Sequence, residues 1–278
     1  MSIARIRLCC ASLLAALLPL ASIAVEDAPF VPTPDEVVTA MLELAKVGPG
    51  DHVIDLGSGD GRVVIAAARR FGATGMGVEK SPALVARSQE NARRAGVESK
   101  VRFLEQDLFK ADLAPATVVT LYLMPDMNLR LRSDLLALKP GTRVVSHRWD
   151  MGDWKPDRSV EVSVRDPRSG VPRAHTVHLW IVPLAADGIW CATGKYATTK
   201  MQLNQDYQRA TGNIIDASGV NFVDAAIEGG TLKAASGGRL VHVPKDDTLR
   251  VENAAGVFER FAGNTFIRSC CGSCPPSR

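Results

Sequence analysis

The sequence predicts a doubly wound α/β fold of Rossmann-like type, with a mostly parallel seven-stranded sheet and a small C-terminal antiparallel β unit. Up to residue 146, short apolar runs alternate with segments of helical period, which is typical of parallel strands joined by helices. Two further predicted strands, 159–165 and 176–182, are joined by a loop too short for a parallel crossover and must pair antiparallel. After Leu184 the helical period disappears, and short alternating segments with Gly-Gly turns replace it.

Each element of the first part has its own signal. Apolar residues stand at helical spacing over 35–47, and Gly48-Pro49-Gly50 then ends that helix. Ser81 and Pro82 provide an N-cap and a first-turn proline for a later helix, which Gly96 closes. The whole pattern predicts helices at 35–47, 63–70, 82–95 and 126–138, and parallel strands at 53–56, 73–78, 101–106, 117–123 and 142–146.

A glycine-rich loop follows the first strand, in the stretch 53–62 that reads VIDLGSGDGR. Its three glycines allow a tight turn and a close approach of the backbone to a ligand, and the next helix points its free N–H groups at the loop. The pattern D-x-G-x-G-x-G differs from the G-x-G-x-x-G of dinucleotide sites. A carboxylate before the glycines suits a cationic amino group better than a phosphate. We therefore expect a cofactor to contact Asp55, Gly57, Ser58, Gly59 and Gly61.

Acidic residues also end the second and third strands. Glu79 follows Gly59 by 20 residues, at the position where an acid typically accepts hydrogen bonds from ribose hydroxyls. Asp107 or its neighbour Gln106 is placed to meet an adenine. Each acid alone has a simpler interpretation as a solvated cap at a strand end. Together, in this order, they resemble the S-adenosylmethionine site of class I methyltransferases.

Several longer motifs make the resemblance more specific. They are the segments PFVPTP at 29–34, DLGSGDGR at 55–62, YLMPDMN at 122–128, SH at 146–147 and DMGDWKPD at 150–157. In this order they resemble the ATP synthase c-subunit lysine N-methyltransferase family and its archaeal and bacterial protein-lysine methyltransferase relatives. The match covers roughly residues 28–182. It implies a class I methyltransferase fold, S-adenosyl-L-methionine as cofactor and a lysine side chain as methyl acceptor.

The resemblance also assigns roles to residues. It implies that Asp55 and the loop glycines hold the methionine part of the cofactor, Glu79 the ribose, and Asp107 the adenine side. Thr33 would touch the cofactor carboxylate, or alternatively N-cap the 35–47 helix. The segment from Tyr122 to Met127 would border the methyl group and the substrate channel.

Proton removal from the acceptor has several candidates by position. Tyr122 and Asp126 are the expected catalytic residues, with Tyr122 also beside the cofactor, and His147 and Asp153 are further possibilities. Asp126 has an alternative as a helix cap, and His147 as a hydrogen-bonded strand-end histidine. Trp149 and Trp154 are candidates for the walls of a lysine channel, although large aromatic side chains more often simply pack.

The N-terminus has the pattern of an export signal. Arg5 and Arg7 precede an apolar run over 8–20, and Ser22-Ile23-Ala24 is typical of a cleavage site. The run is short for a bilayer span, which needs ~20 residues. We expect a signal peptide at 1–24, a periplasmic protein without a stable membrane span after cleavage, and a substrate protein in the cell envelope. The alternative is an uncleaved anchor.

The composition and the cysteines limit which partners and metals the chain is expected to bind. The 33 basic and 30 acidic residues give a net charge of +3, which is too balanced to argue for a nucleic-acid partner. Three cysteines near the C-terminus, in Cys270-Cys271-Gly-Ser-Cys274, have a spacing similar to that of a metal or redox cluster. A loose tail is the simpler interpretation, and no metal is expected. We expect a methyltransferase domain at 28–184, a small β domain at 187–251 and a disordered tail at 252–278.

Three functions are compatible with these features. The chain is either a protein-lysine methyltransferase, a methyltransferase that acts on a small molecule, or an exported module that keeps the fold without turnover.

Overall fold

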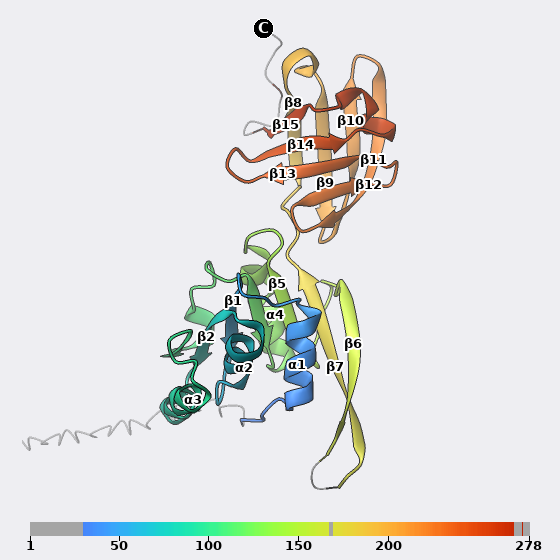
Figure 1. Cartoon of the computed structure of the whole chain (residues 1–278). Coiled ribbons are helices and arrows are strands. Elements are labelled where there is room, and N and C mark those ends of the chain that lie inside the picture. Colours follow the sequence, from blue (N-terminus) through green and yellow to red (C-terminus); the bar gives the residue numbers. More distant parts are fainter. Residues whose placement is uncertain (1–29, 167–168, 270–273, 275–278) are drawn as a thin grey trace, which may run out of the picture. The chain divides into compact units, whose positions relative to one another are not determined.

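The computed structural model describes residues 30–166, 169–269 and Cys274, which form a seven-stranded sheet with helices and then a closed β-barrel (Figure 1). The expected signal peptide at 1–24 lies outside the described residues. Within them, no helix combines the length and hydropathy that a bilayer span requires.

The seven-stranded sheet has the predicted doubly wound topology, with strand order β3-β2-β1-β4-β5-β7-β6. Neighbouring strands from β3 to β5 pair in parallel, and β7 pairs antiparallel with both β5 and β6. The predicted sheet is therefore confirmed, including its one reversed strand. The strands are β1 His52–Leu56, β2 Thr74–Glu79, β3 Val101–Glu105, β4 Val118–Leu121, β5 Arg143–His147, β6 Arg158–Arg165 and β7 Pro172–Ile181.

The helices begin and end close to the predicted residues. They are α1 Asp35–Leu44, α2 Arg62–Phe71, α3 Pro82–Ala95 and α4 Pro125–Leu136, with a 3-10 turn η1 at Leu108–Lys110. Ser81 caps α3 as predicted, and Gly96 ends it in the left-handed region. Helix α1 ends before the predicted Val47 because Lys46 adopts a positive φ of 51°.

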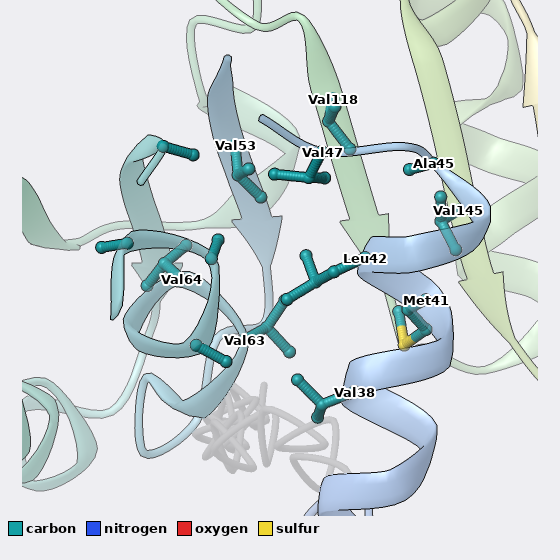
Figure 2. Close-up of a cluster of buried hydrophobic side chains, with 14 of the residues drawn as sticks. Val38, Met41, Leu42, Ala45, Val47, Val53, Val63, Val64, Val118 and Val145 are labelled. Atoms are coloured by element: carbon teal, nitrogen blue, oxygen red, sulfur yellow. The ribbon is translucent and has the colours of Figure 1, made fainter. Parts of the chain in front are cut away.

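Two apolar layers cover the two faces of the sheet. Side chains of α1, α2 and α3 pack with Val53, Val118 and Val145 on one face, as Figure 2 shows for α1 and α2. On the other face, Leu131 and Leu135 of α4 pack with residues of β1, β2, β4 and β5. Because both faces of the central strands are covered, the polar groups of the candidate site stand at or near the strand ends.

The C-terminal β unit is a closed barrel of eight antiparallel strands. Large apolar side chains fill it, among them Trp190, Phe258, Phe261 and Phe266, all buried. Its strands are β8 Gly188–Ala192, β9 Lys200–Asp206, β10 Arg209–Asp216, β11 Gly219–Glu228, β12 Thr231–Ala234, β13 Arg239–Val243, β14 Thr248–Asn253 and β15 Thr265–Arg268, with 3-10 turns η2 Gly194–Tyr196 and η3 Gly256–Phe261.

The predicted end of the β unit at residue 251 is wrong. That position lies inside β14, and β15 is needed to close the barrel because it pairs with both β14 and β8. A 3-10 turn, η3, interrupts the alternating strand pattern before this last strand. Cys274 forms a disulfide with Cys191 of β8, so the tail is joined to the barrel there. Residues 270–273 and 275–278, with two of the tail cysteines, lie outside the described residues.

Candidate active site

The candidate site lies where parallel strands β1 to β5 end at one edge of the sheet. Because carboxyl ends of parallel strands share an edge, residues from distant parts of the sequence meet there. Asp55, Glu79, Tyr122 and His147 all stand among the last residues of a strand or directly after one.

The glycine loop after β1 adopts a backbone that favours glycine at three positions. Gly57, Gly59 and Gly61 have φ values of 74°, 54° and 78°. At Gly57 a Cβ would also lie 2.9 Å from Leu123, and at Gly61 it would lie 2.6 Å from the Phe103 ring. The loop is therefore a close-fitting backbone cradle that side chains would fill.

Helix α3 and strand β2 hold this loop in place. The Ser88 hydroxyl donates to the Gly59 carbonyl over 2.8 Å, and the Asn91 amide donates to the Asp60 carbonyl over 2.9 Å. The Gly59 N–H in turn donates to Glu79 over 2.9 Å. Ser88 and Asn91 are not predictable from the sequence, because nothing in a helical pattern shows which polar side chain meets a loop.

Asp55 is buried in the floor of the site, with only 5% of its surface exposed. Its carboxylate accepts a hydrogen bond from the Thr120 hydroxyl over 2.6 Å. Burial, together with the nearby carboxylates of Glu79 and Asp60, raises the pKa of Asp55 to about 7, against the lowering effect of the hydrogen bond from Thr120. Among the described residues no basic side chain pairs with Asp55. A cationic ligand group would stabilise its charged form.

Asp60 and Arg62 connect the loop to the segment before α1. The Arg62 guanidinium donates to both carboxylate oxygens of Asp60, over 2.9 and 2.7 Å, and to the Thr33 carbonyl over 2.8 Å. Burial alone would raise the pKa of Asp60, but Arg62 and the nearby Arg87 hold it below its ordinary value. The loop and the Thr33 segment are thus joined by a charged, partly buried contact.

Glu79 is the last residue of β2, Gln106 and Asp107 follow β3, and each of the three forms a hydrogen bond with a backbone group. The second oxygen of Glu79 accepts from the Ser81 N–H over 2.9 Å. Asp107 is exposed and caps the turn η1 by accepting from Phe109, while the Gln106 amide donates to the Lys110 carbonyl. The structure places them on the neighbouring strand ends of one edge, and their ribose and adenine contacts stay predictions.

Thr33, Tyr122 and His147 come together at the ends of β4 and β5. His147 is fully buried, and its ring stacks on Tyr122 with centroids 4.0 Å apart. The Thr33 hydroxyl lies 3.4 Å from His147 Nδ1, and His175 Nδ1 lies 2.9 Å from His147 Nε2. Burial lowers the pKa of His147 to about 4, with smaller effects of His175 and Arg148, so the ring is neutral at pH 7.

Other candidates stand apart from this cluster. The capping alternatives for Thr33 and Asp126 are both wrong, because Pro34 is the N-cap of α1 and Met124 that of α4. Asp126 and Asp153 have exposed side chains. Trp154 is a core residue rather than an open channel wall, because it is fully buried and packs against Trp180.

His175 is a further member of this cluster that the sequence did not predict. It lies on β7, which the sequence predicted only as an antiparallel closing strand. Its contact with His147 depends on the pairing of β7 with β5, and the number of residues between them gives no signal of it.

Comparisons with known proteins agree with this geometry. A family profile described as the ANTKMT methyltransferase domain matches residues 55–158, beginning at Asp55. A protein-lysine N-methyltransferase of Saccharolobus islandicus is 38% identical over 160 residues, which are 57% of this chain and 96% of that relative. The ATP synthase c-subunit lysine N-methyltransferase of Mus musculus is 37% identical over 133 residues, 48% of this chain. The chain spans only 53% of that mouse protein.

A solved structure is also similar. It is an RNA methyltransferase from Salinibacter ruber in complex with S-adenosyl-L-homocysteine, 52% identical, with a TM-score of 0.50. It aligns with 55% of this chain and 95% of that one. The backbone cradle, the buried Asp55 and the buried Ser58 hydroxyl, which lacks a partner among the described residues, fit a cofactor of this kind.

Proposed function

Because the chain belongs to the family of S-adenosylmethionine-dependent methyltransferases that carry the ANTKMT methyltransferase domain, we propose that it methylates lysine side chains of a protein substrate. One observation carries the choice of acceptor. The Saccharolobus islandicus relative, whose name is protein-lysine N-methyltransferase, aligns over 96% of its length with the part of this chain that holds the site.

The residues of the cradle would hold the cofactor, which supplies an activated methyl group on a sulfonium centre. Asp55 would pair with its amino group, and the close-packed glycines would let the backbone reach it. Glu79 would receive the ribose. Asp107 and Gln106 would border the adenine from the end of β3.

The acceptor nitrogen must lose a proton before it can attack. A free lysine has a pKa of ~10.4, and an apolar environment lowers this value by disfavouring the charged ammonium. The Tyr122 ring, which stacks on the neutral, buried His147, would shield the amine from water on one side. Most of the catalysis would then come from holding the amine in line with the methyl group.

The proposal extends to location. We propose that the protein is exported, as its N-terminal segment with Arg5, Arg7 and the apolar run 8–20 predicts. The disulfide between Cys191 and Cys274 supports this, since such bonds persist mainly in oxidising compartments. A substrate in the cell envelope follows from that location.

A second candidate function is methylation of RNA. The observation that favours it is the Salinibacter ruber structure, which is 52% identical and is titled an RNA methyltransferase. The near balance of 33 basic and 30 acidic residues is the main argument against it, because RNA binding relies on clustered positive charge.

One experiment separates these functions. The purified protein is incubated with methyl-tritiated S-adenosylmethionine and either cell-envelope proteins, total RNA or an extract of small molecules. We expect label in a protein band and methylated lysine after hydrolysis, with loss of both in Asp55→Asn. Label in RNA instead would favour the second candidate. Cofactor binding by calorimetry without any labelled acceptor would favour a module that has lost turnover.

A further inference from the structure

His147 is placed as a structural link rather than as a proton acceptor. Both of its ring nitrogens already have partners, Thr33 on one side and His175 on the other. A base needs a free lone pair directed at the acceptor, and these contacts leave none. The low pKa of His147 agrees with this, because the ring holds a proton only weakly.

The contacts of His147 form a continuous path from the cofactor loop to Tyr122. Asp60 of the loop pairs with Arg62, and Arg62 holds the Thr33 carbonyl over 2.8 Å. The Thr33 hydroxyl faces His147, whose ring stacks on Tyr122 at 4.0 Å. We call this chain of five residues, Asp60, Arg62, Thr33, His147 and Tyr122, the loop-to-tyrosine link.

His175 holds the link from the other side. It lies half-buried on β7 and contacts His147 Nε2 over 2.9 Å. A ring fixed at both nitrogens cannot rotate about its χ2 angle without breaking one of the contacts. The plane of His147, and with it the stacking surface for Tyr122, is therefore set by Thr33 and His175.

We infer that His147 is a positioning residue for the methyl acceptor, which fixes the Tyr122 ring and ties it to the cofactor loop through Thr33 and Arg62. The inference rests on the proposed function and goes beyond it, because it assigns Thr33 to the acceptor side of the site. Methyl transfer requires in-line geometry, and a displacement of about 1 Å costs on the order of 100-fold in rate. A buried, doubly anchored ring meets that requirement.

A substitution at Thr33 distinguishes two roles for this residue, binding of the cofactor and anchoring of His147. If Thr33 held the cofactor carboxylate, as the family resemblance implies, Thr33→Val would weaken cofactor binding. If it anchors His147, the same change lowers the rate and leaves cofactor binding nearly unchanged. Thr33→Val keeps the shape of the side chain and removes only the hydroxyl, and Thr33→Ser restores that hydroxyl.

The first measurement is kinetic and uses the full chain with tritiated S-adenosylmethionine and poly-L-lysine as the amine probe. We expect Thr33→Val and His175→Ala to lower kcat about 10- to 100-fold, with the calorimetric Kd for the cofactor within about threefold of wild type. Thr33→Ser should recover most of the loss. His178→Asn is the matched control, because His178 also lies on β7 but bonds to Ser159. A Kd weakened by the same factor as kcat, or an unchanged kcat, would overturn the inference.

The second measurement needs no activity. The chain has three tyrosines, so ¹³C-labelled tyrosine gives few ring signals, and Tyr122 is assigned by its loss in Tyr122→Phe. Thr33→Val and His175→Ala should shift and broaden the Tyr122 ring signals and leave those of Tyr196 and Tyr207 in place. Unmoved Tyr122 signals would refute the link. Moved signals in a protein that methylates no amine would support the link and refute the proposed function, so the two failures are distinguishable.

Discussion

Asp55 is a buried carboxyl group with which no described basic side chain pairs. Its hydrogen bond from Thr120 orients the carboxylate, while burial and two neighbouring acids raise its pKa to about 7. In the free protein it is thus about half protonated near neutral pH. A bound cation would shift this equilibrium toward the charged carboxylate.

This gives a prediction for the pH dependence of cofactor binding. Because the charged form pairs with the ammonium group, binding displaces a proton from Asp55 below pH 7, so affinity rises with pH between about 5.5 and 7 and then levels off. Calorimetry in buffers of different ionisation enthalpy measures the released proton directly. In Asp55→Asn the affinity should be lower and its slope over this range should vanish. An equal slope in the variant would contradict the assignment.

The same pKa has a consequence for folding that runs in the opposite direction. A carboxyl group whose pKa is raised on folding contributes stability that is complete below the unfolded value of 3.8 and is lost as pH rises through about 7. Bound cofactor removes this loss by supplying the cation. Thermal unfolding should therefore show a larger stabilisation by S-adenosylmethionine at pH 7.5 than at pH 5.5, and a pH-independent stabilisation would contradict it.

The strand–loop–helix unit around the glycine loop is the element on which the site depends. The adjacent strand β2 packs so closely against the glycine loop that one of its own residues must be glycine. A Cβ at Gly77 of β2 would lie 2.6 Å from both the Phe103 ring and the Ser58 hydroxyl. Because Ser58 belongs to the loop, the packing of β2 against Ser58 helps to fix the conformation of the cradle.

We expect Gly77→Ala to weaken cofactor binding at least about tenfold and to lower the free energy of unfolding by about 1 to 3 kcal/mol, since overpacking displaces the loop. Calorimetry and urea unfolding measure the two effects. Gly48→Ala is the matched control, because no atom lies within 4 Å of its Cβ position. It should change stability by less than about 0.5 kcal/mol. Equal effects of both substitutions would contradict the packing argument.

At the scale of the whole molecule, the disulfide between Cys191 and Cys274 joins residues 83 positions apart and ties the end of the chain to β8. A cross-link over a loop of this length stabilises a fold chiefly by restricting the unfolded chain, by up to about 4 to 5 kcal/mol. The barrel also depends on β15, the last strand, for its closure.

We therefore expect the double variant Cys191→Ser with Cys274→Ser to unfold at lower urea concentration than the wild type. Wild type with reductant should match the variant, and reductant should leave the variant unchanged. Cofactor affinity, measured in parallel, should not move because both cysteines lie outside the candidate site. Identical midpoints for wild type with and without reductant would rule out a stabilising role for the bond.

The sequence by itself determined the order and type of the elements in the sheet domain and the position of the glycine loop. These are local properties: helical and strand periods repeat within a few residues, and three glycines before a helix need no distant partner to be recognised. The same holds for Ser81 and Gly96, which cap α3 where the sequence placed them. The sequence also predicted that the acidic residues at the strand ends lie at one edge of the sheet, because parallel strands bring their carboxyl ends together.

Only the tertiary structure decided which side chains meet. Thr33 and His147 are 114 residues apart, and Asp55 and Thr120 are 65 apart. Their contacts follow from the pairing of β1 with β4 and from the course of the chain before α1, which no local period encodes. For the same reason, the sequence could not predict that β15 closes the barrel or that Cys274 pairs with Cys191. Long-range contacts are selected by the packing of whole elements, so the sequence predicted where a cofactor would bind, and only the fold showed that the His147 ring stacks on Tyr122.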